Sequence, residues 1–500
     1  MFKIFRGFNL VSNLHKQKQE ADEHPSQFLK KLIYSIIVLF VTLFLWNIPA
    51  DWYGIEGLTV IQQRIIAIFA FATLMWILEI VPSWATSVAI IVLMLLTTSN
   101  SGIKPLMYEE AGDPLPYKDI MASFADPVIM LFIGGFLLAI AATKTGLDAQ
   151  LAKNLLKPFG SKANNVLLGF ILITGIFSMF VSNTATAAMM LTFLTPVFKQ
   201  LPPEGKGRIA LTLSIPIAAN LGGMATPIGT PPNGIALKYL NDPEGLNMNL
   251  GFGEWMMFML PLVIVLLFLG WILLRTFFPF SQKTINLEIE GGMKKGFHTW
   301  VVIVTFFITV LLWITDKYTG INSNTVALIP FVIFALTGVI TKYDLEEINW
   351  SVIWMVAGGF ALGYGLNSSG LAANAMKSIP FGSLSPIVIL IVSGLICYML
   401  SNFISNSATA ALLMPILAVV CSGMGDKLDA IGGTPTVLIG IAVAASSAMV
   451  LPISTPPNAL AYSTNLVKQN DMVKIGLIMG IISMVLGYTV LYFLGNAHFF

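Results

Sequence analysis

The chain has 500 residues, of which 56% are hydrophobic and 10% charged, and its mean hydropathy is +0.81. Soluble globular chains carry about 25% charged residues, so this composition excludes a soluble protein. The net charge of +2 and the lack of a basic cluster with interleaved aromatic residues exclude a nucleic-acid-binding protein. Apolar runs of about 20 residues recur from Leu32 onwards and predict an all-α polytopic protein embedded in a lipid bilayer.

The first segment, residues 1–31, is polar and lacks the apolar core and cleavage site of a signal peptide. It is interpreted as a cytoplasmic N-terminal tail. Four spans are then predicted, at about 32–48, 59–80, 84–98 and 127–142. Residues 143–165 combine charged residues with leucines at every fourth position, which is typical of a helix lying along the membrane interface.

The next two segments are apolar but broken by polar residues. Residues 166–198 are interrupted at Ser182-Asn183-Thr184, and arms of about 15 residues are too short to cross a bilayer, which predicts a re-entrant hairpin with this motif at its tip. Residues 208–240 are interrupted at Gly222-Gly223 and at Thr230-Pro231-Pro232, which predicts two half-helices joined by an unwound loop. A span at about 255–274 and a basic loop follow.

The second half of the chain repeats these landmarks in the same order. The first tip motif recurs as Ser405-Asn406-Ser407. The phrase Thr230-Pro231-Pro232-Asn233 recurs at nearly the same offset as Thr455-Pro456-Pro457-Asn458. Spans are predicted at about 299–315 and 324–340, a second hairpin at 385–420, a second broken helix at 433–463 and a last span at 474–494. Landmarks that keep one offset indicate an internal duplication.

Each half contains five crossings and a hairpin. Five is an odd number, so the two halves must insert with opposite topology, and the sequence predicts an inverted repeat with about 11 transmembrane spans. The distribution of Lys and Arg places the N-terminus in the cytoplasm and the C-terminus outside. The first hairpin then opens to the cytoplasm and the second hairpin opens to the outside.

The segments around the four breaks contain no Lys, Arg, His, Asp or Glu. A site there consists of hydroxyls, Asn amides and helix ends: half-helix N-termini suit a carboxylate, and C-termini with unwound carbonyls suit sodium. Two helix ends supply about half a charge each, so a dianion would be undercompensated, and bound sodium would make up the difference. The lack of intramembrane acids and histidines argues against a proton relay.

A single Ser-Asn-Thr in an apolar chain is more often a packing device, because Ser and Thr bond back to the preceding turn. Duplication in register with the Thr-Pro-Pro-Asn phrase favours a binding site instead. Other features have structural interpretations: Arg64 and Glu79 are expected in an ion pair or at the interface, and Cys397 and Cys421 as packed apolar thiols. Gly134-Gly135 and Gly358-Gly359 are expected to permit close helix packing.

At these motifs the sequence resembles the divalent anion/sodium symporter family, which carries Krebs-cycle di- and tricarboxylates and sulfate. The resemblance covers about residues 32–500. It implies an elevator-type transporter that forms a homodimer, with a fixed scaffold domain and a moving transport domain in each protomer.

The resemblance also implies roles for individual residues. Substrate carboxylates would be contacted by Ser182, Asn183, Thr184, Thr230, Ser405, Asn406, Ser407, Thr455 and Pro456. Candidate sodium sites would comprise Ser178, Ser182, Asn183 and Gly229 in the first half, and Ser401, Ile404, Asn406 and Ser454 in the second. No cofactor is implied beyond sodium as a coupling ion. Ser407 departs from the family pattern, where a Thr is expected, and this leaves the size of the substrate open.

In this interpretation the chain divides into eight segments. The scaffold comprises 32–142 and 299–366, interfacial arm helices occupy 143–165 and 367–382, and the two halves of the transport domain occupy 166–276 and 383–500. A cytoplasmic tail, 1–31, and a cytoplasmic loop, 277–298, complete the chain.

The leading interpretation is a secondary active transporter of C4–C5 dicarboxylates (succinate, malate, fumarate or 2-oxoglutarate) in the plasma membrane. Coupling by sodium symport and by dicarboxylate counter-exchange both remain open, as do citrate and sulfate as substrates. An anion channel is the alternative of a different class. A membrane enzyme is disfavoured, because the site segments contain no nucleophile–base pair and no metal cluster.

Overall fold

The computed structural model describes residues 25–106, 111–203, 205–243, 245–285, 292–378, 385–497 and 499. The regular secondary structure of these residues consists of helices. Strand pairing among them is limited to two isolated β-bridges. Eight of the described helices are long and apolar enough to cross a membrane. Most of the cytoplasmic tail predicted at 1–31 and the end of the arm predicted at 367–382 lie outside the described residues.

The helices of the first part of the chain lie close to their predicted positions. They are α2 (Pro25–Asn47), α3 (Val60–Leu78), α4 (Ser83–Thr97), the short α5 (Tyr117–Ala122), α6 (Pro127–Thr145) and the amphipathic α7 (Leu147–Leu156). Asp126 begins α6, because its carboxylate accepts a 3.0 Å hydrogen bond from the Val128 N–H, and Pro127 occupies the first helical position. Gly146 ends α6 in the left-handed region at φ 73°, which turns the chain into α7.

Helix pairs occupy both predicted hairpin segments, and the arms of the first pair are longer than the sequence predicted. The first consists of α8 (Ala163–Phe180) and α9 (Asn183–Gln200), with 18 residues each, and the second of α19 (Pro386–Ser401) and α20 (Asn406–Met424), with 16 and 19 residues. The expectation of arms of about 15 residues was therefore wrong. Because Asn164 and Asn165 are compatible with a helix, α8 begins at Ala163, before the apolar run, and it is one of the eight helices long enough to cross a membrane.

Both predicted broken helices are confirmed. The first comprises α10 (Lys206–Gly223) and α11 (Pro231–Leu240), and the second α21 (Gly433–Ser447) and α22 (Pro456–Ser463). In each, the paired prolines occupy the first turn of the second half-helix, where their missing N–H groups cost no hydrogen bond. The long helices α12 (Phe252–Phe277) and α23 (Gln469–Asn496) follow.

The remaining helices precede the second hairpin. They are α13 (Phe297–Ile314), α14 (Asp316–Thr319), α15 (Ser323–Val326), α16 (Leu328–Leu336), α17 (Trp350–Ser368) and the arm helix α18 (Leu371–Ser378). The segment predicted as a span at 324–340 is an apolar helical stretch that ends at Leu336, earlier than predicted, and is interrupted at Ala327 between α15 and α16. The Ala327 carbonyl lies against Gly134 of α6, where a Cβ atom would come within 2.1 Å of it.

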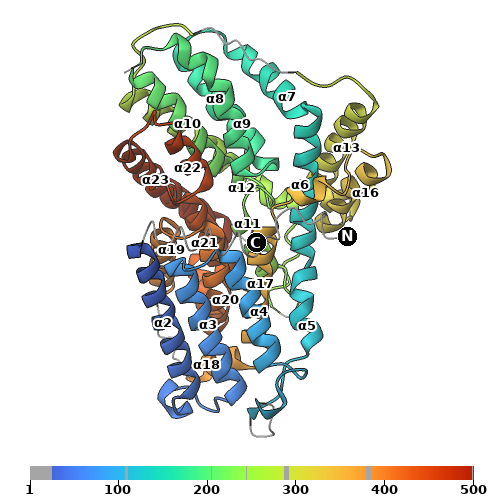
Figure 1. The fold of residues 1–500 in the computed structure, drawn as a ribbon, viewed down its shortest axis with the longest axis vertical. Helices are drawn as coiled ribbons and strands as arrows, with labels where there is room; N and C mark the ends of the chain where they lie inside the picture. The colour runs from blue at the N-terminus through green and yellow to red at the C-terminus, as the bar shows by residue number, and fades with distance from the viewer. Residues whose placement is uncertain are drawn as a thin grey trace.

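Helix packing interleaves the two halves of the chain. The helix α22 packs against α9 and α10 of the first half, and α11 packs against α20 and α21 of the second. Elsewhere α4 packs against α17, α2 against α3, and α6 against α13 and α16. In Figure 1, α8, α9 and α10 lie near one end of the molecule and α2, α3 and α18 near the other, with α13 and α16 beside α6.

Close packing at the paired glycines is confirmed. A Cβ atom on Gly358 would lie 2.5 Å from the Ser87 Cβ, and one on Gly359 would lie 2.6 Å from the Ala411 Cβ. These glycines therefore let α17 approach α4 on one side and α20 on the other. Cys397 and Cys421 are buried free thiols, as expected.

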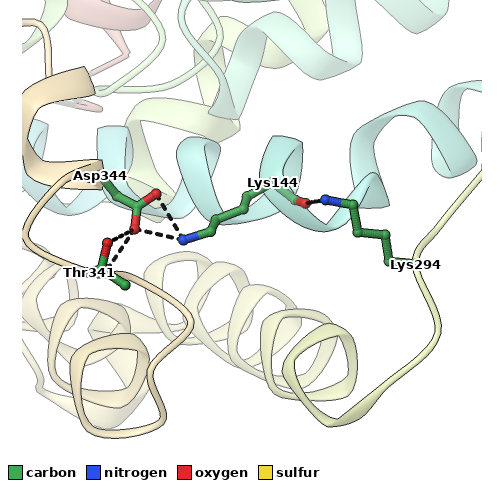
Figure 2. Close-up of polar contacts among 4 residues, drawn as sticks. All are labelled: Lys144, Lys294, Thr341 and Asp344. Carbon is green, nitrogen blue, oxygen red and sulfur yellow. Dashed lines mark hydrogen bonds and ion pairs between the residues drawn. The ribbon is translucent and has the colours of Figure 1, made fainter.

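Charged residues at the helix ends have structural partners. The Arg64 guanidinium is buried and donates to the carbonyls of Thr97 and Leu106 at 2.9 and 2.8 Å, and Glu79 is exposed at the end of α3. At the end of α6, Lys144 forms an ion pair of 2.7 Å with Asp344, which precedes α17 (Figure 2). Arg64 is therefore held by backbone carbonyls, and the ion pair or interfacial position expected of Arg64 and Glu79 stays a prediction.

Candidate functional site

The two hairpin tips and the two Thr-Pro-Pro-Asn loops surround one cavity of about 440 Å³. The opposite wall comes from the start of α4, the middle of α6 and the start of α17. The cavity-lining residues of these helices are Pro82, Ser83, Trp84, Phe132, Phe136, Asn349, Ser351, Val352 and Met355. No charged side chain is among the described residues that line this cavity.

The helix N-termini of the two tips and the two loops, four in all, meet at this cavity, across from the starts of α4 and α17. The residues that precede α9, α11, α20 and α22 are Ser182, Thr230, Ser405 and Thr455, and all four line it. Each N-terminus carries about half a positive charge, so four of them together supply about the charge that balances a dianion. The expectation of only two contributing ends, and hence of an undercompensated dianion, was wrong, because both loops add an end to those of both tips.

The hydroxyl groups at three of these ends cap their own helices. The Ser182 and Ser405 hydroxyls accept from the N–H groups of Ala185 and Ala408 at 3.3 and 3.2 Å, and Thr455 accepts from the Asn458 N–H at 3.3 Å. These bonds explain why three of the four motifs begin with Ser or Thr. In α9 and α20 the first two N–H groups of the first turn are free of helical partners, which suits an anion. The helices α11 and α22 begin with two prolines, which have no N–H, so their ends act through the helix dipole and the Thr hydroxyl.

The Asn that ends each Thr-Pro-Pro-Asn phrase holds the unwound loop before it. The Asn233 amide donates to the carbonyls of Gly223, Met224 and Thr226 at 2.8–3.2 Å. Asn458 donates to the corresponding carbonyls of Met449 and Leu451 at 2.8 and 2.9 Å. These bonds satisfy carbonyls that the helix break leaves without partners, so this Asn shapes the loop.

Oxygen atoms converge beside the first tip. The side-chain oxygen of Asn183 lies 2.5 Å from the Ser178 hydroxyl oxygen, 3.2 Å from the Ala219 carbonyl and 3.1 Å from the Gly229 carbonyl. The single Ser178 hydrogen can satisfy only one pair of these oxygens. Either a turned Asn183 amide or a small cation balances the cluster, and oxygen atoms are the ligands that hard cations prefer.

The second tip has a looser version of this arrangement. The Ser401 hydroxyl donates to the Asn406 side-chain oxygen at 3.2 Å. Beside it, the Ser454 hydroxyl donates to the Asn402 carbonyl at 2.9 Å, and the Asn402 side chain accepts from the Val450 N–H at 2.9 Å. Hydrogen bonds within the protein therefore hold Asn402, Ser454 and the loop beside the second tip.

The structure brings most of the predicted site residues together. Of the residues for which the resemblance implies substrate or sodium contacts, those that line the cavity are Ser182, Asn183, Thr184, Gly229, Thr230, Ser405, Asn406, Ser407, Ser454, Thr455 and Pro456. Ser178, Ser401 and Ile404 are buried behind this surface, and the first two are hydrogen-bonded to the tip asparagines.

Sequence reasoning missed Asn220, which is buried in α10 and lines the cavity. Its side chain donates to the Thr455 hydroxyl at 3.1 Å and to the Asn458 side-chain oxygen at 3.3 Å, so it joins the first half of the chain to the second. A lone Asn within an apolar run, just before Gly222-Gly223, was the signal that could have revealed it.

Comparisons with known proteins show the family to which the chain is similar. Residues 73–432 match the model of a family described as citrate transporters (CitMHS). The chain is 30% identical over 469 residues to the sodium-dependent dicarboxylate transporter SdcS of Staphylococcus saprophyticus, with 86% of this chain and 85% of that protein covered. It is 29% identical over 519 residues to SdcS of Staphylococcus aureus, with 96% and 93% covered.

Two solved structures share the fold at low sequence identity. The Alcanivorax borkumensis YdaH transporter aligns with a TM-score of 0.54 at 13% identity, covering 83% of this chain and 98% of its own. MtrF of Neisseria gonorrhoeae, described with a class of antimetabolite efflux pumps, aligns with a TM-score of 0.51 at 12% identity, covering 82% and 94%. At these identities the likeness concerns the fold alone.

Proposed function

This chain belongs to the citrate transporter family, among the di- and tricarboxylate carriers of the divalent anion/sodium symporter family, and from that premise we propose that it carries C4–C5 dicarboxylates with sodium. It is a multi-pass membrane transporter and not an enzyme. Succinate, malate, fumarate and 2-oxoglutarate are the proposed substrates.

The observation that carries the proposal is the meeting of four helix N-termini at one uncharged cavity of about 440 Å³. A flexible dianion with a carboxylate at each end fits between two tips that each present Ser, Asn and a further hydroxyl. Ser182, Asn183 and Thr184 would bind one carboxylate, and Ser405, Asn406 and Ser407 the other, helped by Thr230, Thr455 and Pro456. Hydroxyl and N–H donors suit a carboxylate without fixing it in place, as transport requires.

Two observations support sodium coupling. Oxygen atoms cluster at the first tip, and the SdcS relatives are described as sodium-dependent transporters. Ser178, Ser182, Asn183 and the Gly229 carbonyl would hold one ion. Ser401, Asn406 and the backbone at Ile404 and Ser454 would hold a second. Sodium at the C-terminal ends of α8 and α19 would complement the helix dipoles while the dianion occupies the N-terminal ends.

The proposed mechanism is of the elevator type, in a homodimer. The helices α8–α12 and α19–α23 would move as one transport domain, because the broken helices and hairpins of the two halves pack against one another. The helices α2–α6 and α13–α17 would form the scaffold, with α7 and α18 as the connecting arms. The inverted repeat, the count of about 11 spans, the plasma-membrane location and the cytoplasmic N-terminus belong to the same proposal.

The deciding experiment is radiolabelled succinate uptake into proteoliposomes. Uptake is compared with sodium outside, in sodium-free medium, and with unlabelled dicarboxylate preloaded inside. Saturable, sodium-dependent uptake without preloading is the expected result. Uptake that requires internal dicarboxylate and ignores sodium would replace symport by exchange, non-saturable flux would indicate an anion channel, and stronger competition by citrate or sulfate would change the substrate.

A further inference from the structure

The Thr455 hydroxyl oxygen already has two hydrogen-bond donors. It accepts from the backbone N–H of Asn458 at 3.3 Å and from the side-chain amide of Asn220 at 3.1 Å. A hydroxyl oxygen has two acceptor positions and one donor hydrogen. Both acceptor positions are therefore filled, and only the hydrogen is left for a ligand in the cavity that Thr455 lines.

The orientation of the Asn220 amide follows from its second partner. The Asn458 side-chain nitrogen donates to two backbone carbonyls, at 2.8 and 2.9 Å, and carbonyls can only accept. Asn458 must therefore turn its side-chain oxygen toward Asn220, 3.3 Å away, and that oxygen requires a donor. Asn220 thus presents its NH₂ group, and both of its hydrogens are used, one on Asn458 and one on Thr455.

The first half of the chain lacks this arrangement. Asn220 stands ten residues before Thr230, and the residue ten before Thr455 is Ala445. The Asn233 side-chain oxygen, which corresponds to the one that Asn220 satisfies, is buried without a partner in the described part of the chain. The Thr230 side chain makes no capping bond to its helix. Its hydroxyl therefore keeps its acceptor positions, whereas that of Thr455 does not.

We propose that Asn220 is a positioning residue that fixes the Thr455 hydroxyl as a hydrogen-bond donor to a substrate carboxylate. The inference rests on the proposed function and deepens it, because it makes the two Thr-Pro-Pro-Asn loops unequal. The loop at Thr455 is restricted to an anionic or other accepting group. The loop at Thr230 can turn its hydroxyl oxygen or its hydrogen to a ligand. The chain from Asn458 through Asn220 to Thr455 is what sets this difference.

Removal of the Asn220 amide frees one acceptor position of Thr455, so its hydrogen is no longer directed at the substrate. Asn220→Ala should raise the KM for succinate about tenfold, the weight of one hydrogen bond to a charged group. Because the tip asparagines are unchanged, the maximal rate and the sodium half-saturation should change by less than about twofold. Asn220→Leu, which keeps the branched shape and the number of heavy atoms of the side chain, should raise the KM to a similar extent and serves if the Ala variant fails to fold.

A double-mutant cycle in sodium-driven proteoliposome uptake tests the inference. Thr455→Val alone should raise the KM for succinate, and the addition of Asn220→Leu to it should change the KM by less than about twofold, because the hydroxyl that Asn220 positions is gone. The matched control pairs Asn220→Leu with Thr230→Val. In that pair the two effects on KM should multiply, since Asn220 makes no bond to Thr230.

Two outcomes overturn the inference. If Asn220→Leu raises KM as much in the Thr455→Val background as in the wild type, Asn220 acts by steadying Asn458 and not through the hydroxyl. If Asn220→Leu leaves the KM unchanged, the position has no role in binding. Both results require a wild-type protein that transports succinate; wild-type vesicles that take up no dicarboxylate would instead refute the proposed function, and this inference with it.

Discussion

The two Thr-Pro-Pro-Asn loops share their sequence but are fastened by different residues. In the first half, the Thr226 hydroxyl donates to the Met179 carbonyl and accepts from the Gly229 N–H at 3.1 Å. In the second half Leu451 stands in place of Thr226, and Asn402 and Ser454 hold the loop to the tip. The halves therefore share the Thr-Pro-Pro-Asn phrase and differ in the residues that fasten the backbone around it.

The two hairpin tips also differ in exposure. Thr184 of the first tip is exposed, whereas Ser407 of the second is buried, 9% exposed. The second tip packs against α17, where the Ser405 hydroxyl lies 3.7 Å from the Met355 sulfur. One duplicated motif therefore has an exposed hydroxyl residue in the first half and a buried one in the second.

The largest effects are expected at the asparagines that both tips share. Asn183→Ala and Asn406→Ala should each reduce succinate uptake at least about a hundredfold, because each removes several polar contacts to charged ligands. Uptake by proteoliposomes is the measurement, with size-exclusion chromatography in detergent as the control for folding. Normal uptake by either variant would show that its tip does not bind the substrate, so that only the other half of the chain contributes a tip to the site.

Sodium dependence should separate the tips next. Ser178 belongs to the tight oxygen cluster and Ser401 to the looser one, with hydroxyl-to-amide oxygen distances of 2.5 and 3.2 Å. Ser178→Ala should raise the sodium half-saturation of uptake about tenfold, and Ser401→Ala about threefold. Equal shifts in sodium titrations of the two variants would contradict the ranking of the two clusters.

Substrate size should respond to Ser407 more than to its counterpart Thr184. Ser407→Thr adds one methyl group in a buried position of the cavity wall. It should weaken competition by 2-oxoglutarate relative to fumarate about fourfold, the weight of one methyl group. Thr184→Ser, at the exposed tip, is the matched control and should leave the competition profile unchanged.

The smallest effect is expected on thermal stability, from the ion pair between Lys144 and Asp344. The second half has no counterpart of this Lys, because Ser368 stands where Lys144 would recur. Burial raises the pKa of Asp344, but the hydrogen bonds from Lys144 and Thr341 outweigh it, so the pKa lies below its ordinary value (Figure 2). The stabilisation is present above the ordinary aspartate pKa of about 3.9 and is lost as the pH falls through the folded value.

Asp344→Asn should lower the melting temperature at pH 7 by about 2 °C, a small change because Lys144 is partly exposed and screened. The difference from the wild type should shrink below about pH 4. Thermal melting in detergent across this range is the measurement. A difference that grows on acidification would mean that Asp344 is destabilised by its surroundings.

The fold was predicted where the signal is local. The prolines at 231, 232, 456 and 457 cannot continue a helix, so both broken helices were readable from the sequence. Element lengths were less accurate, because the hairpin arms extend into residues such as Asn164 and Asn165 that are neutral toward helix formation. The break between α15 and α16 lies at Ala327, whose carbonyl lies against Gly134 of α6, and the sequence does not reveal this contact.

The sequence by itself determined which residues could form the site: uncharged Ser, Thr and Asn at breaks in apolar runs, repeated in register. These properties are local, because helix breaking and capping depend on neighbours along the chain. The tertiary structure alone decided that four helix ends share one cavity, and that Asn220 of the first half reaches Thr455 of the second. Such contacts arise when segments far apart in the sequence pack together, and the spacing of residues along the chain does not predict which segments will pack.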